Sequence, residues 1–133
     1  MDNVKKEQVD AYLNMLSQFK QDVEEIVLGV EKLENYSDYP QAVSNNAKRG
    51  IELNKKVNNR CATSVGKVRA QQLANREKIS VDTIKRMYSY LSRAETYYDA
   101  NDTTACGTIS YLLWGGLAGK RWAESKLKKL GKL

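Results

Sequence analysis

The stretch Leu112-Leu-Trp-Gly-Gly-Leu-Ala-Gly-Lys-Arg-Trp-Ala-Glu124 decides how this chain folds, because it holds both tryptophans and three of the eight glycines. A glycine directly after Trp114 can adopt the left-handed conformation that ends a helix. A third glycine, four residues further on, leaves room for a neighbouring helix, and the turn folds both indoles toward a shared core. We interpret this stretch as a structural hinge between two helices, formed by Trp114, Gly115, Gly116, Gly119 and Trp122.

The same glycines do not form a nucleotide-binding loop. Such a loop needs a glycine five positions before its Gly-Lys pair and a serine or threonine directly after that pair. In this sequence Trp114 stands at the first of these positions and Arg121 at the second. We therefore expect no nucleotide cofactor at the hinge.

Before the hinge, apolar side chains follow an unbroken three-four spacing along the N-terminal part of the chain. They are Val9, Tyr12, Leu16, Phe19, Val23, Ile26, Val30 and Leu33. This spacing predicts a long amphipathic helix from about Val4 to Glu34 with a single apolar stripe. The stripe either packs against the protein's own body or pairs with a helix of another molecule, which makes it a candidate partner-binding helix.

The remaining sequence predicts further helices separated by short polar links. Their expected ranges are Pro40–Val57, Thr63–Asn75, Val81–Tyr98, Thr104–Trp114 and Leu117–Leu130. Ser37 or Asp38 is expected to cap the first of them, and Ser80 the third. No alternating strand pattern is present. The predicted fold is all-α, a compact bundle of about five to six helices, with residues 1–36 as an assembly or packing arm and residues 37–133 as a basic helical domain.

Charge is distributed unevenly between these two parts. Residues 1–40 carry four basic and nine acidic side chains, whereas the rest carries 18 basic and seven acidic ones. A basic body of this kind suits nucleic acid or an acidic protein surface, and the acidic arm suits the basic body of another copy. The cationic C-terminal helix is either a solvated last turn or a binding tail.

Composition also excludes several classes of function. Histidine is absent, which removes the commonest general base and metal ligand, so we expect no enzyme, no cofactor, no metal and no small-molecule substrate. No apolar run reaches the roughly 20 residues that a membrane helix needs, and nothing resembles a signal peptide. In an intracellular setting, Cys61 and Cys106 are expected to be two free, buried thiols.

One segment has the spacing of a DNA-binding helix-turn-helix motif, from Leu73 to Met87. In that interpretation Val81, Asp82, Lys85, Arg86 and Ser89 face DNA. The turn position that glycine usually occupies holds Lys78, which requires a rearranged turn. The candidate contacts for nucleic acid or an acidic partner are Lys78, Lys85, Arg86, Ser89, Arg121, Lys126, Lys128, Lys129 and Lys132.

Four segments together resemble a small helical domain met in many tailed-phage and prophage proteins, where it occurs alone or attached to head-assembly proteins. They are Lys48-Arg-Gly-Ile-Glu52, Val65-Gly-Lys-Val-Arg-Ala-Gln-Gln-Leu73, Ile79-Ser80 with Thr83-Ile-Lys-Arg-Met87, and Leu112-Leu-Trp-Gly-Gly116 with Gly119 and Trp122-Ala123. Leu117 and Ala94 depart from the pattern, since the family commonly has an acidic residue and a histidine there. The N-terminal helix lies outside the resemblance.

The resemblance implies a non-enzymatic phage structural or accessory protein, associated with the virion or capsid and located in the virion or the host cytoplasm. Its expected partners are capsid or other head components and other copies of itself, reached through protein–protein contacts. The alternative is a helix-turn-helix-like DNA-binding protein of phage or prophage origin. Neither hypothesis involves a membrane.

Overall fold

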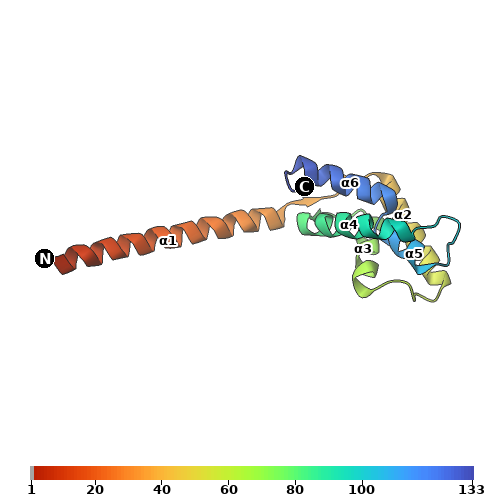
Figure 1. The fold of residues 1–133 in the computed structure, drawn as a ribbon, viewed down its shortest axis with the longest axis horizontal. Coiled ribbons are helices and arrows are strands. Elements are labelled where there is room, and N and C mark those ends of the chain that lie inside the picture. Colours follow the sequence, from red (N-terminus) through yellow and green to blue (C-terminus); the bar gives the residue numbers. More distant parts are fainter. Residues whose placement is uncertain (1) are drawn as a thin grey trace. The chain divides into compact units, whose positions relative to one another are not determined.

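The computed structural model describes the backbone of residues 2–133 and the side chains of residues 8–23 and 34–133. Over the described backbone the chain forms six α-helices, one 3-10 helix and two short strands (Figure 1). The predicted all-α bundle with a long first helix is confirmed. The chain divides into two compact units, Met1–Glu34 and Asn35–Leu133.

The first unit is the single helix α1, Asp2–Leu33. Its 32 residues give a length of about 48 Å at the usual helical rise. The described members of the predicted stripe are exposed, with exposed fractions from 42% at Val23 to 66% at Phe19. Ile26, Val30 and Leu33 also belong to the stripe but lie outside the described side chains.

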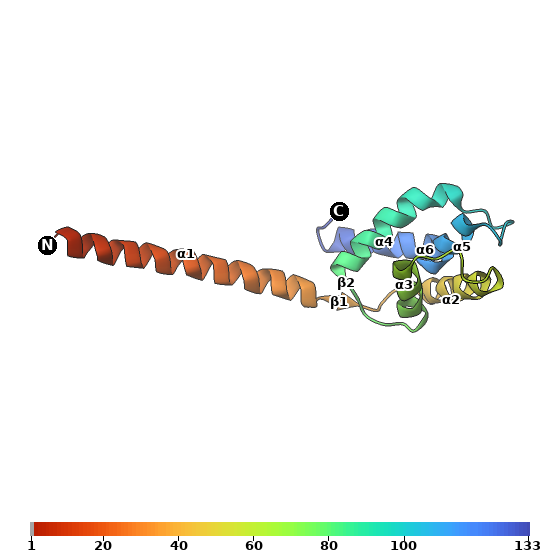
Figure 2. The same ribbon diagram turned by 90° about the horizontal axis from the view of Figure 1, so that it is seen from below.

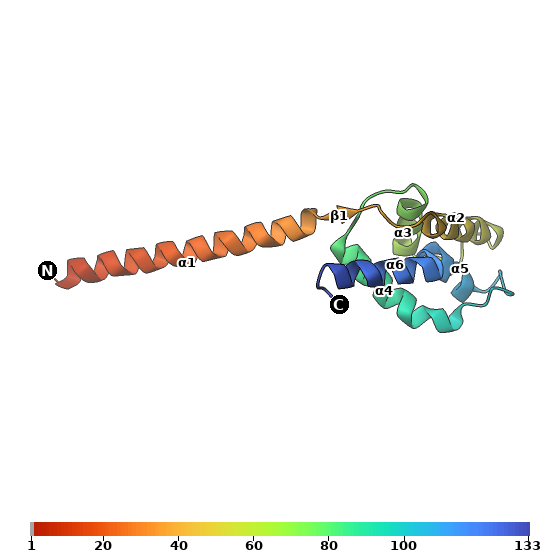
Figure 3. The same ribbon diagram turned by 90° about the horizontal axis from the view of Figure 1, so that it is seen from above.

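The second unit is built from five helices, with the 3-10 helix η1 at Glu95–Tyr97. The helices are α2 Gln41–Lys56, α3 Ser64–Ala74, α4 Val81–Ala94, α5 Cys106–Leu113 and α6 Gly116–Lys129. Within this unit α5 and α6 lie between the α2–α3 pair and α4, as Figure 2 and Figure 3 show from opposite sides. This arrangement places the α5–α6 hinge at the centre of the bundle.

Two apolar clusters form the core of the second unit. The larger joins α2, α3, α4 and α6 with Tyr111 of α5, and includes Ile84, Met87, Leu91 and Trp122. The smaller joins α2, α3 and α5 and includes Leu53, Ala70, Ile109 and Leu113. Trp114 packs against both clusters, so the hinge connects them.

The hinge has the predicted conformation. Gly115 has φ +103° and Gly116 has φ +64°, and together they end α5 and begin α6. The side-chain amide of Asn46 on α2 donates a hydrogen bond to the Gly115 carbonyl oxygen at 2.9 Å. Trp122 then reaches the core, where its ring meets Tyr39 edge-on with centroids 5.3 Å apart.

Of the helix caps predicted from the sequence, the cap of α4 is confirmed and the cap of α2 is wrong. The Ser80 hydroxyl oxygen accepts a hydrogen bond from the Thr83 amide at 3.2 Å, which confirms the predicted cap of α4. The predicted Ser37 or Asp38 cap of α2 is wrong, because Pro40 occupies the cap position and no side chain caps the helix. The Asp38 carboxylate instead pairs with the Lys126 ammonium at 2.6 Å.

Two strands form where none was predicted. β1, Asn35–Tyr36, pairs antiparallel with β2, Ile79–Ser80, with Asn35 opposite Ser80 and Tyr36 opposite Ile79 (Figure 2). Residues 35 and 36, which the sequence placed with the arm, thereby join the second unit. Strands of two residues are too short to produce a recognisable alternation of apolar and polar side chains.

The buried face of α3 is not the one that its large apolar residues would suggest. Val65 and Val68 are 50% and 56% exposed, whereas Leu73 is buried. The buried positions are Gly66, Arg69, Ala70 and Leu73. These positions have the three-four spacing of a helix face. Because two of them are an arginine and a glycine, the face cannot be recognised from the spacing of large apolar residues.

The two cysteines form a disulfide, so the expectation of free thiols is wrong. Cys61 and Cys106 are 45 positions apart in sequence, and their Cα atoms lie 4.8 Å apart. The bond joins the segment after α2 to the first residue of α5, beside the contact between these two helices. The Ser110 hydroxyl donates a hydrogen bond to the Cys61 carbonyl oxygen at 2.8 Å, which closes the same corner.

Replacing Gly50 with alanine should destabilise the second unit, because α2 packs closely on α5 at this position. A Cβ at this position would lie 2.7 Å from the Leu113 backbone nitrogen. Alanine should favour the helix itself by about 1 kcal/mol, but the overpacking costs about 1–3 kcal/mol. We expect a net loss of about 1 kcal/mol in urea unfolding. The exposed Lys48→Ala control should change stability by less than about 0.5 kcal/mol, and equal effects would contradict the close contact.

Candidate functional site

The outer face of α4 is cationic and lines a cavity. Lys85, Arg86, Ser89 and Arg93 are exposed on this helix, on the side away from the core. With Tyr90 and Trp114 they line a cavity of about 360 Å³. The structure thus brings together three of the predicted contact residues, Lys85, Arg86 and Ser89, and adds Arg93, which sequence reasoning missed.

Behind this cavity lies a buried arginine that sequence reasoning also missed. Arg69 on α3 is only 7% exposed, and its guanidinium carbon lies 5.3 Å from the centroid of the Trp114 ring. Its Nη1 donates a hydrogen bond to the Gln72 side chain, but its Nε has no hydrogen-bond partner among the described residues. Burial, and next the positive charge of Arg86, lower the pKa of Arg69. The sequence signal for Arg69 was its three-four spacing with the small or apolar residues Gly66, Ala70 and Leu73.

A second cavity adjoins the first at Tyr90 and Arg93. It has a volume of about 330 Å³, and its further lining includes Ala94, Tyr97 and Gly107. The Tyr97 side chain is 72% exposed. A Cβ on Gly107 would lie 2.8 Å from the Tyr97 carbonyl oxygen, so this glycine lets η1 lie directly against α5. The two cavities together have a cationic end and an aromatic end.

The Tyr90 ring forms the wall between the two cavities. It stacks on Trp114 with ring centroids 4.8 Å apart. Burial raises the pKa of Tyr90, and the hydrogen bond with the Ser110 side chain and the charge of Arg93 oppose this rise. These contacts hold the wall in place between α4 and α5.

Among the described side chains, no carboxylate pairs with the cations of α4. The described ion pairs are Lys120 with Glu95, Lys126 with Asp38 and Lys128 with Glu124. Within the described side chains, Arg69, Lys85, Arg86 and Arg93 take part in no ion pair. Uncompensated positive charge beside a hollow attracts anions, so binding of an anionic group is the chemistry that this arrangement supports.

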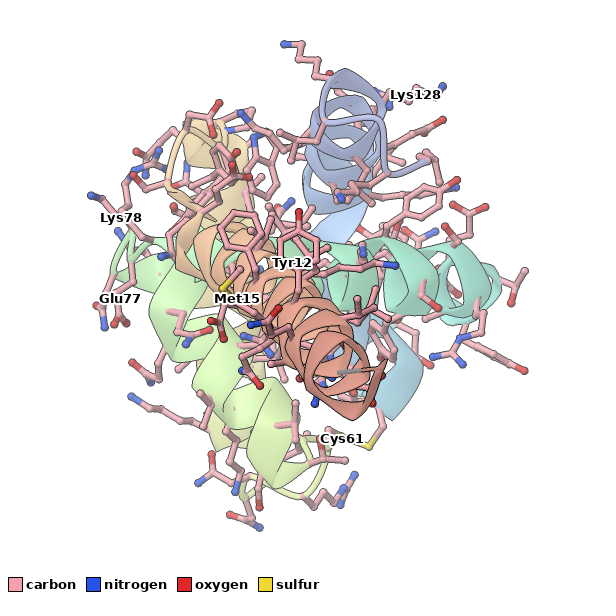
Figure 4. All side chains as sticks on the ribbon, turned by 90° about the vertical axis from the view of Figure 1, so that its left-hand side faces the viewer. Tyr12, Met15, Cys61, Glu77, Lys78 and Lys128 are labelled. Atoms are coloured by element: carbon pink, nitrogen blue, oxygen red, sulfur yellow. A yellow bond between two sulfur atoms is a disulfide. The ribbon has the colours of Figure 1, made fainter. Side chains whose placement is uncertain are left out.

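The other predicted contact residues do not join this surface. Lys78 and Lys128 lie well apart in Figure 4, Lys78 at the left and Lys128 at the upper right, and Lys132 is exposed near the C-terminus. Arg121, Lys128 and Lys129 line a separate hollow on α6 together with Glu124. The predicted cations therefore form more than one surface.

Lys126 has a structural role in the second unit. Besides its ion pair with Asp38, its ammonium lies 4.5 Å from the centroid of the Tyr36 ring. Burial would raise the pKa of Asp38, but the hydrogen bond and charge of Lys126 outweigh it, so the pKa is lowered. These contacts fix β1 to α6.

The geometry departs from a helix-turn-helix in four respects. The link between α3 and α4 is six residues long, 75–80, whereas the motif has a turn of about three to four. Val81, expected to face DNA, is only 6% exposed. The left-handed residue of the link is Arg76, at φ +55°, and not Lys78. In addition, α3 packs chiefly against α2 and α5, whereas α4 packs chiefly against α6.

The described part of the chain holds no cluster of three or more His, Cys, Asp or Glu side chains that could bind a metal ion. None of the helices in that part combines the length and the apolar character needed to cross a membrane.

Comparison with known proteins gives no relative. No family model, no curated protein and no solved structure matches this chain. The resemblance to the phage domain therefore rests on the four sequence segments alone.

Proposed function

We propose that this chain is a non-enzymatic structural or accessory protein of a phage particle, associated with the capsid or another head component. The observation that carries the proposal is the exposed apolar stripe of α1. Val9, Tyr12, Leu16, Phe19 and Val23 repeat at three-four spacing, and each is at least 42% exposed. Such a stripe is the surface by which amphipathic helices join partner helices.

The energetics of the stripe favour a partner. Burial of apolar surface contributes about 25 cal/mol of free energy per Å². A second helix that packs along the stripe buries the apolar surface of all its side chains at once. The wide rings of Tyr12 and Phe19 fit a bundle better than a simple two-stranded coil. We infer that α1 supplies one helix of an assembly with other virion components or with other copies of this chain.

Three further observations support a phage particle as the setting. The four resembling segments span about residues 47–124 and keep one order along the chain. Residues 1–40 are acidic and the remainder is basic, so the acidic part of one copy suits contact with the basic part of another copy. The Cys61–Cys106 disulfide suits a particle that meets oxidising surroundings, since disulfides persist on virion surfaces and are rare in the cytosol.

The experiment is purification of assembled particles, followed by quantification of this chain by mass spectrometry. We expect a fixed copy number per particle. Replacing Tyr12 and Phe19 with glutamate should reduce incorporation by about tenfold or more, because the charges fall on the partner-binding stripe.

A matched control separates the stripe from the general charge of α1. Asn14 and Gln21 are also seven residues apart, but helical geometry places them on the opposite face of α1. Changing both to glutamate adds the same charge and should leave incorporation close to wild type. Absence of the chain from purified particles, or equal losses in the two variants, would refute the proposal.

A further inference from the structure

The two adjoining cavities along α4 combine positive charge with exposed aromatic surface. The first is lined by Lys85, Arg86 and Arg93, and the second by Arg93 and the exposed Tyr97. Positive charge along a groove together with an accessible aromatic ring is the combination by which proteins hold single-stranded nucleic acid. Phosphates meet the cations, and unstacked bases meet the ring.

We propose that these cavities bind a short segment of single-stranded nucleic acid, with phosphates at the α4 cations and a base against Tyr97. The inference rests on the Asn35–Leu133 unit alone and does not depend on the proposed function of α1. Nucleic acid would be a further ligand of this protein, in addition to the protein partners of the proposed function.

The spacing of the cations along α4 fits a strand with several phosphates. From Arg86 to Arg93 the helix rises by about 10 Å, at 1.5 Å per residue. This distance exceeds the rise of about 3.4 Å per nucleotide in one strand of B-form DNA, so the two ends of the row meet different phosphates. A single free phosphate would engage only one end.

The buried Arg69 strengthens the cationic end. Its guanidinium stacks on Trp114, which lines the first cavity, and it has no carboxylate partner among the described residues. Its Nε also lacks a hydrogen-bond partner within the described structure. A buried, unpaired cation acts at short range in a medium of low dielectric, so it raises the positive potential where Arg86 stands.

The aromatic end favours a single strand over a duplex. The Tyr97 ring is 72% exposed beside a hollow of about 330 Å³. A base enters such a hollow only when it is out of the stack, and in a duplex this carries an additional cost of unpairing. Trp114 lines the first cavity together with side chains of α4, so this part of α4 is one wall of a hollow. A helix that reads duplex DNA instead projects into the major groove.

The test is fluorescence anisotropy of a labelled oligothymidylate of about 12 nucleotides, within the usual site sizes for such modules. We expect binding that weakens with salt. Changing Arg86 and Arg93 to glutamine should weaken binding by about tenfold or more. It should also reduce the slope of log affinity against log salt by about 1.4, since each phosphate contact on a single strand contributes about 0.7.

The matched control changes Arg121 and Lys129 to glutamine. Both are exposed, both lie on α6, and the change in charge is the same. This control should leave the salt slope unchanged and the affinity within about threefold of wild type. Equal effects of the two double variants would mean that binding depends on overall charge, and would overturn the site.

A second variant, Tyr97→Ala, tests the base contact. It should weaken binding by at least about fivefold, whereas alanine at Tyr12, an exposed tyrosine of the first unit, should have no effect. An unchanged affinity of Tyr97→Ala, or equal competition by a duplex of the same length or by polyglutamate of the same charge, would overturn the proposal. Stronger competition by unlabelled single strand than by either competitor supports it.

Discussion

Replacing Cys61 and Cys106 with serine should lower the free energy of unfolding of the second unit by about 4 kcal/mol. The disulfide closes a loop with a sequence separation of 45, and restricting such a loop in the unfolded chain stabilises the folded state by about that amount. Single domains are stable by only about 5–15 kcal/mol, so the loss is a large fraction of the whole.

Urea unfolding of the wild type and the double variant, each with and without reductant, measures this effect. Cys106 is exposed, so the reductant can reach the bond. Reduced wild type should unfold at the same midpoint as the variant, and the variant should not respond to reductant. A wild-type midpoint that reductant leaves unchanged would mean that the two cysteines are not joined, or that the bond contributes nothing.

The disulfide illustrates what local sequence patterns do not contain. Helix boundaries depend on neighbouring residues, and α1, α2, α3, α5 and α6 begin and end within about two residues of their predicted limits. The exception is α4, which ends at Ala94 and not at the predicted Tyr98. The Gly115–Gly116 turn was also predictable, because it depends on backbone conformation at two positions. The distance between Cys61 and Cys106 depends on how α2 packs on α5, which no local pattern specifies.

The candidate site shows the same distinction between local and tertiary information. Lys85, Arg86 and Ser89 share a helix, so their spacing alone placed them on one face. Arg69 and Trp114 join them from α3 and from the hinge, 45 residues apart in sequence, through packing that follows from the whole bundle. Arg69 was overlooked because a buried arginine occupies a helix position where an apolar side chain is expected.

The second large effect is expected at the hinge, where Gly115→Ala should destabilise the second unit by about 3 kcal/mol. Gly115 has φ +103°, a conformation that costs an L-residue roughly 1–2 kcal/mol. A Cβ there would also lie 2.9 Å from Cγ1 of Val43 on α2 and 3.3 Å from the Gly119 backbone. Overpacking of this kind adds about 1–3 kcal/mol.

Gly131→Ala separates the two contributions to this loss. Gly131 also has a positive φ, +69°, but a Cβ there would meet nothing within 4 Å. Its replacement should therefore cost only the backbone term, about 1 kcal/mol. Urea unfolding of both variants gives the contact term as the excess loss at Gly115. Equal losses would mean that the α5–α6 turn needs glycine only for its backbone angles, whereas a larger loss at Gly115 means that close approach to α2 also requires it.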